Sequence, residues 1–135
     1  MITIQGLDHV VLRTDAVDDM IRFYRDVLGC TLERRVDEVG LIQLRAGAAL
    51  IDLVDVDGEI GRKGGPAPGA DGYNMDHLCL RVAPFDAAAI AAHLSRHGIE
   101  AGPVERRYGA EGFGPSIYLN DPDGNTVELK GPPEA

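Results

Sequence analysis

Two histidines occupy equivalent places in a seven-residue segment that the chain contains twice. Residues 7–13 are LDHVVLR and residues 75–81 are MDHLCLR, so Asp-His and Leu-Arg recur in register at an offset of 68 residues (77 − 9 = 68). Internal similarity over half of a chain indicates a duplicated structural module. Imidazole is the commonest metal-binding side chain. His9 and His77 are therefore the first two predicted ligands of a shared metal ion.

Two carboxylates complete the predicted ligand set. Asp52 and Glu128 hold corresponding places in the two halves (128 − 52 = 76, the excess over 68 being absorbed by loop insertions). Asp52 lies within the aliphatic run ALIDLV, where an unpaired carboxylate would be costly to bury and a nearby cation would remove that cost. Two imidazoles and Glu128 with open positions suit Fe(II), whereas Asp52 as a fourth ligand suits Zn, Ni, Co or Mn acting as a Lewis acid. Alternatively, Asp52 stays off the metal and acts as a base.

The elements that must position these residues follow from hydrophobic periodicity. Alternation predicts strands at 4–13, 30–36, 40–45 and 48–56, and, after a strand that begins at 75, at 103–108, 115–120 and 125–130. Apolar residues at helical spacing predict one helix that Asp15 caps and Gly29 ends, and a second that begins near Ala87 and that Gly98 ends. The predicted elements follow the order βαβββ in each half of the chain, which predicts an α+β fold.

The predicted modules span about 4–56 and 75–130 within a single domain of residues 1–135. Residues 57–74 are rich in Gly and Pro and lack apolar periodicity, which indicates an inter-module linker or a lid. Asp121-Pro122-Asp123-Gly124 predicts a type I turn before the last strand. We expect the two modules to form a curved mixed sheet, with helices outside and a concave metal cavity inside.

Strand parity predicts which side chains line that cavity, because alternate residues point to opposite faces. The face opposite the aliphatic one carries His, Glu, Tyr, Gln and Ser rather than the Lys and Glu of a solvated surface, which favours a lined cavity. Gln43 and Tyr118 are predicted to orient a substrate, and Glu111, in the Gly-rich segment 109–114, to supply an acid. The alternative for these three residues is ordinary packing or exposed loop charge.

Bulk properties exclude some classes of partner. A formal net charge of −9 argues against a nucleic-acid groove and against binding to an anionic membrane surface. Cys30 and Cys79 are isolated thiols without CxxC spacing, as expected of a reduced protein. The sequence shows no leader and no apolar run of membrane length, so we expect a soluble cytoplasmic protein.

The segments LDHVVLRT, MIRFYRDVLGC, MDHLCLRV and SIYLNDPDGNTVEL together resemble the vicinal-oxygen-chelate superfamily of glyoxalases, bleomycin-resistance proteins and extradiol dioxygenases. The resemblance covers nearly the whole chain and is greatest to small glyoxalase-like members. It implies one divalent metal ion on His9, Asp52, His77 and Glu128, although Asp52 departs from the Glu, Gln or His usual in the family. It also implies a homodimer and a small substrate that offers two neighbouring oxygens to the ion.

Departures from the family patterns divide the candidate activities. Extradiol dioxygenases have a Tyr ten residues before the metal Glu, and Tyr118 matches (128 − 118 = 10), but the His expected before that Tyr is missing from residues 109–114. Arg106 and Arg107 are candidates for the substrate-anion pocket of fosfomycin-resistance members, with solvated surface as the alternative. We therefore expect a metal-dependent lyase or isomerase in which Asp52, Glu128 and Tyr118 take part in catalysis. The alternatives are a drug-binding protein without catalysis and an Fe(II) ring-cleaving dioxygenase.

Overall fold

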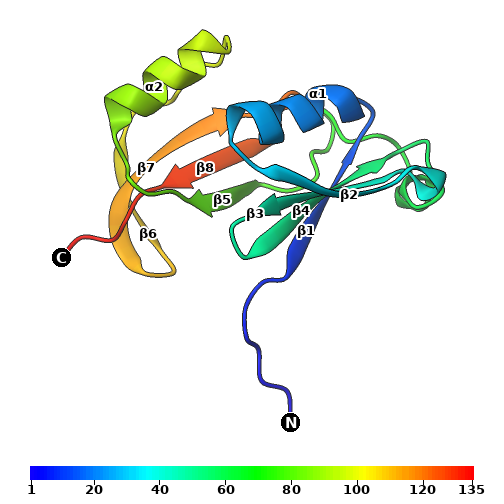
Figure 1. Ribbon diagram of the computed structural model, residues 1–135, viewed down its shortest axis with the longest axis horizontal. Helices are drawn as coiled ribbons and strands as arrows, with labels where there is room; N and C mark the ends of the chain where they lie inside the picture. The colour runs from blue at the N-terminus through cyan, green and yellow to red at the C-terminus, as the bar shows by residue number, and fades with distance from the viewer. The chain divides into compact units, whose positions relative to one another are not determined.

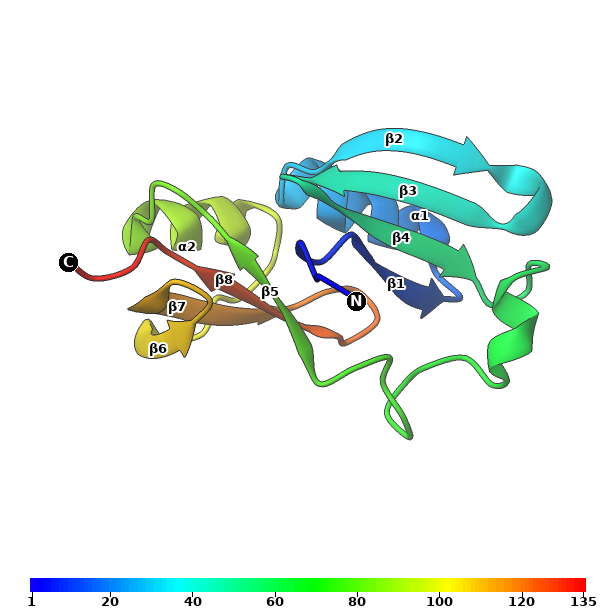
Figure 2. The ribbon, with the colours of Figure 1, turned by 90° about the horizontal axis from the view of Figure 1, so that it is seen from below.

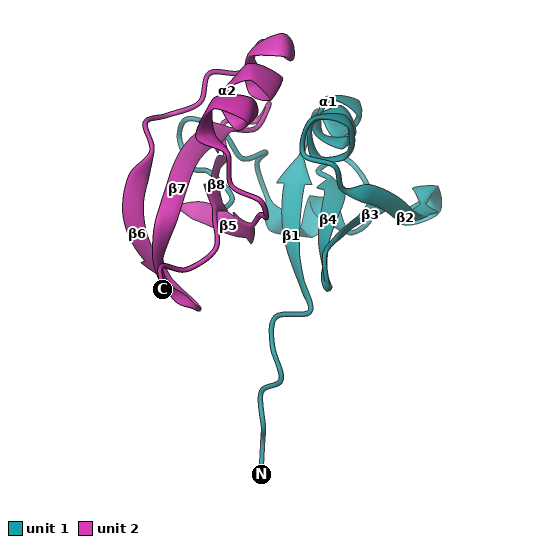
Figure 3. Cartoon of the chain, turned by 60° about the vertical axis from the view of Figure 1, so that its left-hand side comes forward, with its two compact units in different colours: residues 1–74 teal, residues 75–135 magenta.

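The computed structural model describes residues 1–135 and divides into two compact units, Met1–Asn74 and Met75–Ala135 (Figure 3). The first unit contains β1 (His9–Thr14), α1 (Val17–Ile21), the π-helix η1 (Arg22–Val27), β2 (Thr31–Val36), the 3-10 turn η2 (Asp37–Val39), β3 (Leu41–Ala46), β4 (Ala49–Asp55) and the 3-10 turn η3 (Gly61–Gly64). The second contains β5 (His77–Arg81), α2 (Ala87–Arg96), β6 (Glu105–Gly109), β7 (Gly112–Asn120) and β8 (Thr126–Lys130). Each unit thus repeats the order βαβββ (Figure 1), which confirms the predicted α+β fold class.

Each unit has its own four-stranded mixed sheet. The strand order is β1-β4-β3-β2 in the first unit, as Figure 2 shows, and β5-β8-β7-β6 in the second. β1 runs parallel to β4 and β5 runs parallel to β8, whereas the remaining neighbours are antiparallel. The first and last strands of each module are therefore adjacent, and this adjacency brings residues distant in sequence onto one pair of strands.

The aliphatic face of each sheet packs under the helix of the same unit. In the first unit the buried side chains are Leu12, Ile42, Leu44, Ile51 and Leu53 from the sheet, with Met20, Ile21 and Tyr24 from the helix. In the second unit they are Leu78, Ile117, Leu119, Val127 and Leu129 from the sheet and Leu94 from α2. Burial of one such side chain contributes about 1.5–3 kcal/mol. The other face of each sheet is left to the polar residues that parity assigned to it.

The first strand and the first helix differ from the sequence-based expectation. β1 begins at His9 rather than at residue 4, and Leu7 is 85% exposed. Asp15 does not cap the helix, so that prediction was wrong: the N-cap is Ala16, and its amide donates to the buried Thr14 hydroxyl at 2.9 Å. The second half of the helix is a π-helix. Its wider turn reduces the rotation between consecutive residues, which lets the neighbouring rings of Phe23 and Tyr24 both be buried.

The ends of both helices and the last turn agree with the sequence. Gly29 and Gly98 adopt positive φ angles of 85° and 73° after the helices, a conformation that glycine favours. Gly124 donates its amide to the Asp121 carbonyl at 2.9 Å, which closes the predicted turn. No helix in the structure combines the length and the apolar character needed to span a membrane.

The Gly- and Pro-rich segment 57–74 is tied to β1 by Arg13. The Arg13 guanidinium donates to the carbonyls of Gly61, Gly65 and Pro66 at 2.7–3.2 Å. The Asn74 side chain in turn exchanges two hydrogen bonds with the Arg13 backbone, at 2.9 and 3.0 Å. This segment therefore belongs structurally to the first unit, and the Arg of the first LxLR repeat serves to hold it.

Candidate functional site

His77 and Glu128 lie together on the polar face of the second sheet. In the β5–β8 ladder Cys79 is opposite Glu128, and His77 lies two residues before Cys79, on the same face. His77 Nε2 is 3.3 Å from Glu128 Oε1, and Glu128 is only 5% exposed. On the other side of the ring, His77 Nδ1 is 2.6 Å from Asp76 Oδ2. A carboxylate on Nδ1 orients the imidazole and leaves Nε2 for a ligand, as is usual at metal sites.

The first unit repeats this arrangement with His9 and Asp52. Val11 faces Asp52 in the β1–β4 ladder, so His9 and Asp52 have the same diagonal relation as His77 and Glu128. His9 Nδ1 is 2.7 Å from Asp8 Oδ1. This hydrogen bond to Asp8, followed by the charge of Asp52, raises the pKa of His9. The equivalence of Asp52 and Glu128 that the sequence repeat predicts therefore holds in the strand pairing.

Gln43 holds the Asp52 carboxylate. Its Nε2 lies 3.3 Å from both Asp52 oxygens, and Arg34 donates to its Oε1 at 3.2 Å. The Arg34 contact fixes the amide so that its NH2 group points at the carboxylate, while Asp52 is 4% exposed. Gln43, predicted to orient a substrate, is thus placed where it positions Asp52.

Tyr118 takes the place in the second unit that Gln43 takes in the first, directly opposite the carboxylate. Its ring packs edge-on against His77 at 5.6 Å between centroids, and the Arg107 guanidinium lies 4.0 Å from its ring centre. Arg107 also donates to Ser116 Oγ at 2.6 Å and pairs with Glu105 at 3.0 Å. A hollow of about 440 Å³ borders Tyr118, between residues 100–103 and Thr126. It offers room for a small molecule beside the predicted site.

Glu111, from the β6–β7 hairpin, forms an ion pair with Arg81 of β5. The hydrogen bond and charge of Arg81 lower the pKa of the Glu111 carboxyl, so this group is ionised at neutral pH. In that state Glu111 accepts a proton or a hydrogen bond but has no proton to donate.

Cys79 is expected to be an unreactive thiol in the metal-free protein. Burial, together with the charge of Glu128 and a hydrogen bond to it, raises the pKa of Cys79 to about 11. Because the thiolate is the nucleophile, alkylation by iodoacetamide at neutral to weakly basic pH should be roughly 100-fold slower than for a free cysteine of ordinary pKa. The rate should rise with pH through the pKa of Cys79, and peptide mass spectrometry measures it separately from Cys30. A chelated, folded protein whose Cys79 reacts as fast as the urea-unfolded chain contradicts this expectation.

The structure brings the predicted ligands together in pairs. His77 meets Glu128 in one unit, and the charge of Asp52 acts on His9 in the other. His, Cys, Asp and Glu side chains form no group of three or more that could hold a metal ion. Asp8 and Asp76 were not predicted as site residues, although the repeated Asp-His dipeptide signals the carboxylate that orients each ring.

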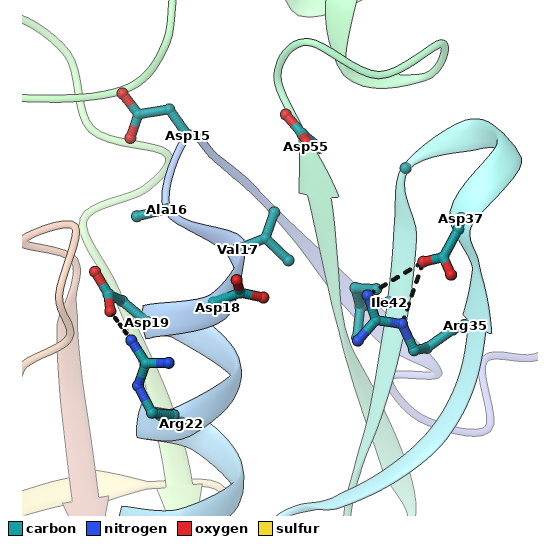
Figure 4. A pocket seen from close by; sticks show the side chains of 11 residues that line it. Asp15, Ala16, Val17, Asp18, Asp19, Arg22, Arg35, Asp37, Ile42 and Asp55 are labelled. Atoms are coloured by element: carbon teal, nitrogen blue, oxygen red, sulfur yellow. Dashed lines mark hydrogen bonds and ion pairs between the residues drawn. The ribbon is translucent and has the colours of Figure 1, made fainter.

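A larger groove in the first unit contains none of the predicted site residues. It measures about 560 Å³ and lies between the start of α1, the start of β3 and the end of β4 (Figure 4). Most of its charged side chains are carboxylates, and two of these pair with arginines in the same groove: Asp19 with Arg22, and Asp37 with Arg35. Ile42 places the groove on the helix face of the sheet, whereas Asp52 is on the opposite face.

Comparisons with known proteins show the family and the fold of the chain. The family described as Glyoxalase/Bleomycin resistance protein/Dioxygenase superfamily matches residues 6–129. Virulence protein STM3117 of Salmonella typhimurium is 34% identical over 128 residues, which cover 93% of this chain and 83% of that protein. Its crystal structure has a TM-score of 0.79 at 29% identity and covers 96% of this chain and 98% of that one.

Two further relatives extend the comparison. The glyoxalase domain-containing protein RDO1 of Mycosarcoma maydis is 35% identical over 132 residues, which cover 95% of this chain and 69% of that protein. Lactoylglutathione lyase of Agrobacterium tumefaciens shares the fold, with a TM-score of 0.64 at 23% identity over 94% of this chain and 93% of that one. The chain therefore belongs to the glyoxalase/bleomycin resistance/dioxygenase superfamily.

Proposed function

We propose that this protein is a divalent-metal-dependent lyase or isomerase that acts on a small oxygenated substrate. The observation that carries the proposal is the repeated pair: each unit places a histidine and a buried carboxylate on adjacent parallel strands in the same relative register. In each pair the preceding aspartate holds Nδ1 and leaves Nε2 for a ligand. We propose that His9, Asp52, His77 and Glu128 are the metal ligands.

The donor set suits such an ion in chemical type. Two imidazoles and two carboxylates are ligands of Zn, Ni, Co, Mn and Fe(II), and members of this superfamily typically use a divalent metal. Asp52 and Glu128 are 4% and 5% exposed, and a cation would compensate the cost of burying their charges. When bound, the ion supplies Lewis acidity that polarises a substrate oxygen.

The side chains of this protein supply orientation and proton transfer. Gln43 fixes the Asp52 carboxylate, which either ligates the ion or, when detached, removes a proton from carbon as a general base. Tyr118 presents its phenol next to Glu128 and the 440 Å³ hollow, where it can orient a substrate oxygen. Arg107 holds the Tyr118 ring in place. A homodimer and a cytoplasmic location belong to the same proposal.

Metal reconstitution tests the proposal. Adding Zn, Ni, Co, Mn or Fe(II) to chelated protein at about 100 times the dissociation constant should stabilise the fold by about 2.7 kcal/mol. For a chain of this length the melting temperature should rise by about 9 °C, as measured by differential scanning fluorimetry. The metal that binds at one equivalent is then used to screen small oxygenated compounds for elimination or isomerisation.

The outcomes separate the proposal from its rivals. Protein that stays metal-free after reconstitution contradicts it and favours a ligand-binding protein, and oxygen-dependent ring cleavage with Fe(II) would replace it with a dioxygenase. Asp52→Ala defines the role of that carboxylate. Metal retained with activity lost makes Asp52 the base, whereas metal lost makes it a ligand.

A further inference from the structure

Lys130 carries a buried ammonium group without a partner. This last residue of β8 is 2% exposed, and its Nζ has no hydrogen-bond partner. Lysine is almost never fully buried unless it is paired, because removing an ammonium from water is costly. The structure therefore leaves an ammonium group whose hydrogen bonds an anion from outside the chain could accept.

Strand register places Lys130 on the face that carries Glu128. The two residues are two positions apart on β8, so both side chains leave the same face of the sheet. In the strand register, Lys130 lies opposite Arg81 of β5 and opposite Ser116 of β7. An anion held by Lys130 therefore shares a sheet face with the proposed metal ligands His77 and Glu128.

Two glycines leave room for the Lys130 side chain on that face. A Cβ atom at Gly109 would lie 2.8 Å from Lys130 Cε, and one at Gly114 would lie 3.1 Å from Lys130 Nζ. Gly114 lies on the neighbouring strand β7 and Gly109 on β6 beyond it. The side chain thus extends across the sheet toward the β6–β7 hairpin, and a larger residue at either position would require the end of the lysine side chain to shift.

The neighbouring cations already have carboxylate partners. Arg81 pairs with Glu111, Arg106 with Glu134 at 2.7 Å and Arg107 with Glu105 at 3.0 Å. Lys130 has no comparable partner. After their arginine partners, the charge of Lys130 also acts on the Glu111 and Glu134 carboxyl groups and lowers their pKa values, but its Nζ makes no hydrogen bond to either of them. A ligand with one negative charge matches this single ammonium better than a phosphoryl dianion.

The Arg81–Glu111 ion pair lies across the strand that carries Lys130. β8 is between β5, which carries Arg81, and β7, and Glu111 sits in the hairpin at the start of β7. The side chains of Arg81 and Glu111 are 37% and 51% exposed, so water can replace their contact. Opening this pair gives a ligand a route to Lys130.

We propose that Lys130 binds the carboxylate of a small, singly charged substrate on the same sheet face as Glu128, next to the Arg81–Glu111 ion pair. This inference rests on the proposed function for the reacting end of the molecule and adds the substrate class, a carboxylic acid. Glu111 acts here as a gate that exchanges its contact with Arg81 while the substrate enters.

The test uses the lysine side chains as reporters. Lys63 and Lys130 are the only lysines of the chain, so selective 13C labelling of lysine reports on both, and Lys63→Met assigns the signals. Chelated protein is titrated with propionate, propionamide and methylphosphonate in the millimolar range. We expect propionate to shift the Lys130 signal to saturation while propionamide leaves it in place. No shift with propionate, or stronger binding of methylphosphonate, overturns the assignment to a carboxylate.

Lys130→Met provides a second readout, because it keeps the length of the side chain and removes the charge. Propionate affinity measured by calorimetry should fall at least about tenfold, the effect of losing a hydrogen bond to a charged group. The melting temperature without propionate should be equal or higher, since an unpaired buried charge is removed. A lower melting temperature means that the fold itself pairs the ammonium, which overturns the proposal.

The two proposals can fail separately. The propionate titration contains no metal, so it succeeds or fails whatever the outcome of metal reconstitution. Metal binding without a propionate shift rejects the Lys130 subsite alone. A propionate shift in a protein that binds no metal rejects the metalloenzyme and keeps the subsite.

Discussion

Glu128→Gln is expected to lower the affinity for the divalent metal by more than about 100-fold. Loss of an outer hydrogen-bonding partner of a metal ligand already costs 10–100-fold, so loss of the ligand's charge should exceed that range. Glutamine keeps the shape of the side chain and can still contact His77 Nε2, which is 3.3 Å from Glu128 Oε1. The change therefore removes charge with little effect on packing. Competition against a chromophoric chelator measures the affinity.

Glu59→Gln is the matched control, because Glu59 is an exposed carboxylate outside the predicted site. Its metal affinity should equal that of the unchanged protein. In metal-free protein Glu128→Gln should melt at the same or a higher temperature, since it removes a charge that is 5% exposed. If Glu128→Gln binds metal as tightly as Glu59→Gln does, Glu128 is not a ligand.

Much of the fold could be predicted because it follows from a visible repeat and from the local preferences of neighbouring residues. The repeated Asp-His segment indicates the duplication, and alternation in the strands indicates which face is aliphatic. Gly29, Gly98 and Gly124 mark ends that require positive φ angles. Alternation and the glycine positions depend on the local backbone alone, and the repeat can be recognised in a single sequence.

The differences arose where packing overrides local preference. The first strand was predicted over residues 4–13, but β1 pairs with β4 only from His9 onward. Asp15 is a good capping residue in isolation, yet Thr14 is the residue whose hydroxyl accepts the free amide at the start of the helix. The widening to a π-helix depends on how Phe23 and Tyr24 fill the core, which periodicity does not reveal.

In the candidate site, the sequence predicted which residues correspond in the two halves but not the contacts of the longer side chains. Repeat and parity were sufficient to place His77 beside Glu128, and to make Asp52 the counterpart of Glu128. The partners of the long side chains were not predictable, because they reach across several strands. The contact of Gln43 with Asp52 and the burial of Lys130 became visible only with coordinates.

Asp121→Ala should destabilise the protein by about 3 kcal/mol. Asp121 is 5% exposed, and its Oδ1 accepts the backbone amides of Asp123 and Asn125, each at 2.9 Å. Its Oδ2 accepts the Asn125 side-chain amide at 2.9 Å. Each buried donor left without a partner costs about 1–3 kcal/mol, and relaxation of the turn recovers part of the sum. The melting temperature should fall by about 10 °C for a chain of this length.

Asp86→Ala is the graded control for this prediction. Asp86 caps α2 through a single exposed hydrogen bond from the Ala89 amide at 3.0 Å, and loss of such a cap costs about 1 kcal/mol. The free energies of unfolding of the two variants, measured in urea, should therefore differ by about 2 kcal/mol. Asp121 accepts hydrogen bonds from several buried donors, whereas Asp86 accepts one from an exposed donor. Equal destabilisation would mean that the amides of the 121–125 turn find water once the carboxylate is gone. In that case the 121–125 turn would not determine how the start of β8 aligns with β5. The turn would then have no part in positioning Glu128.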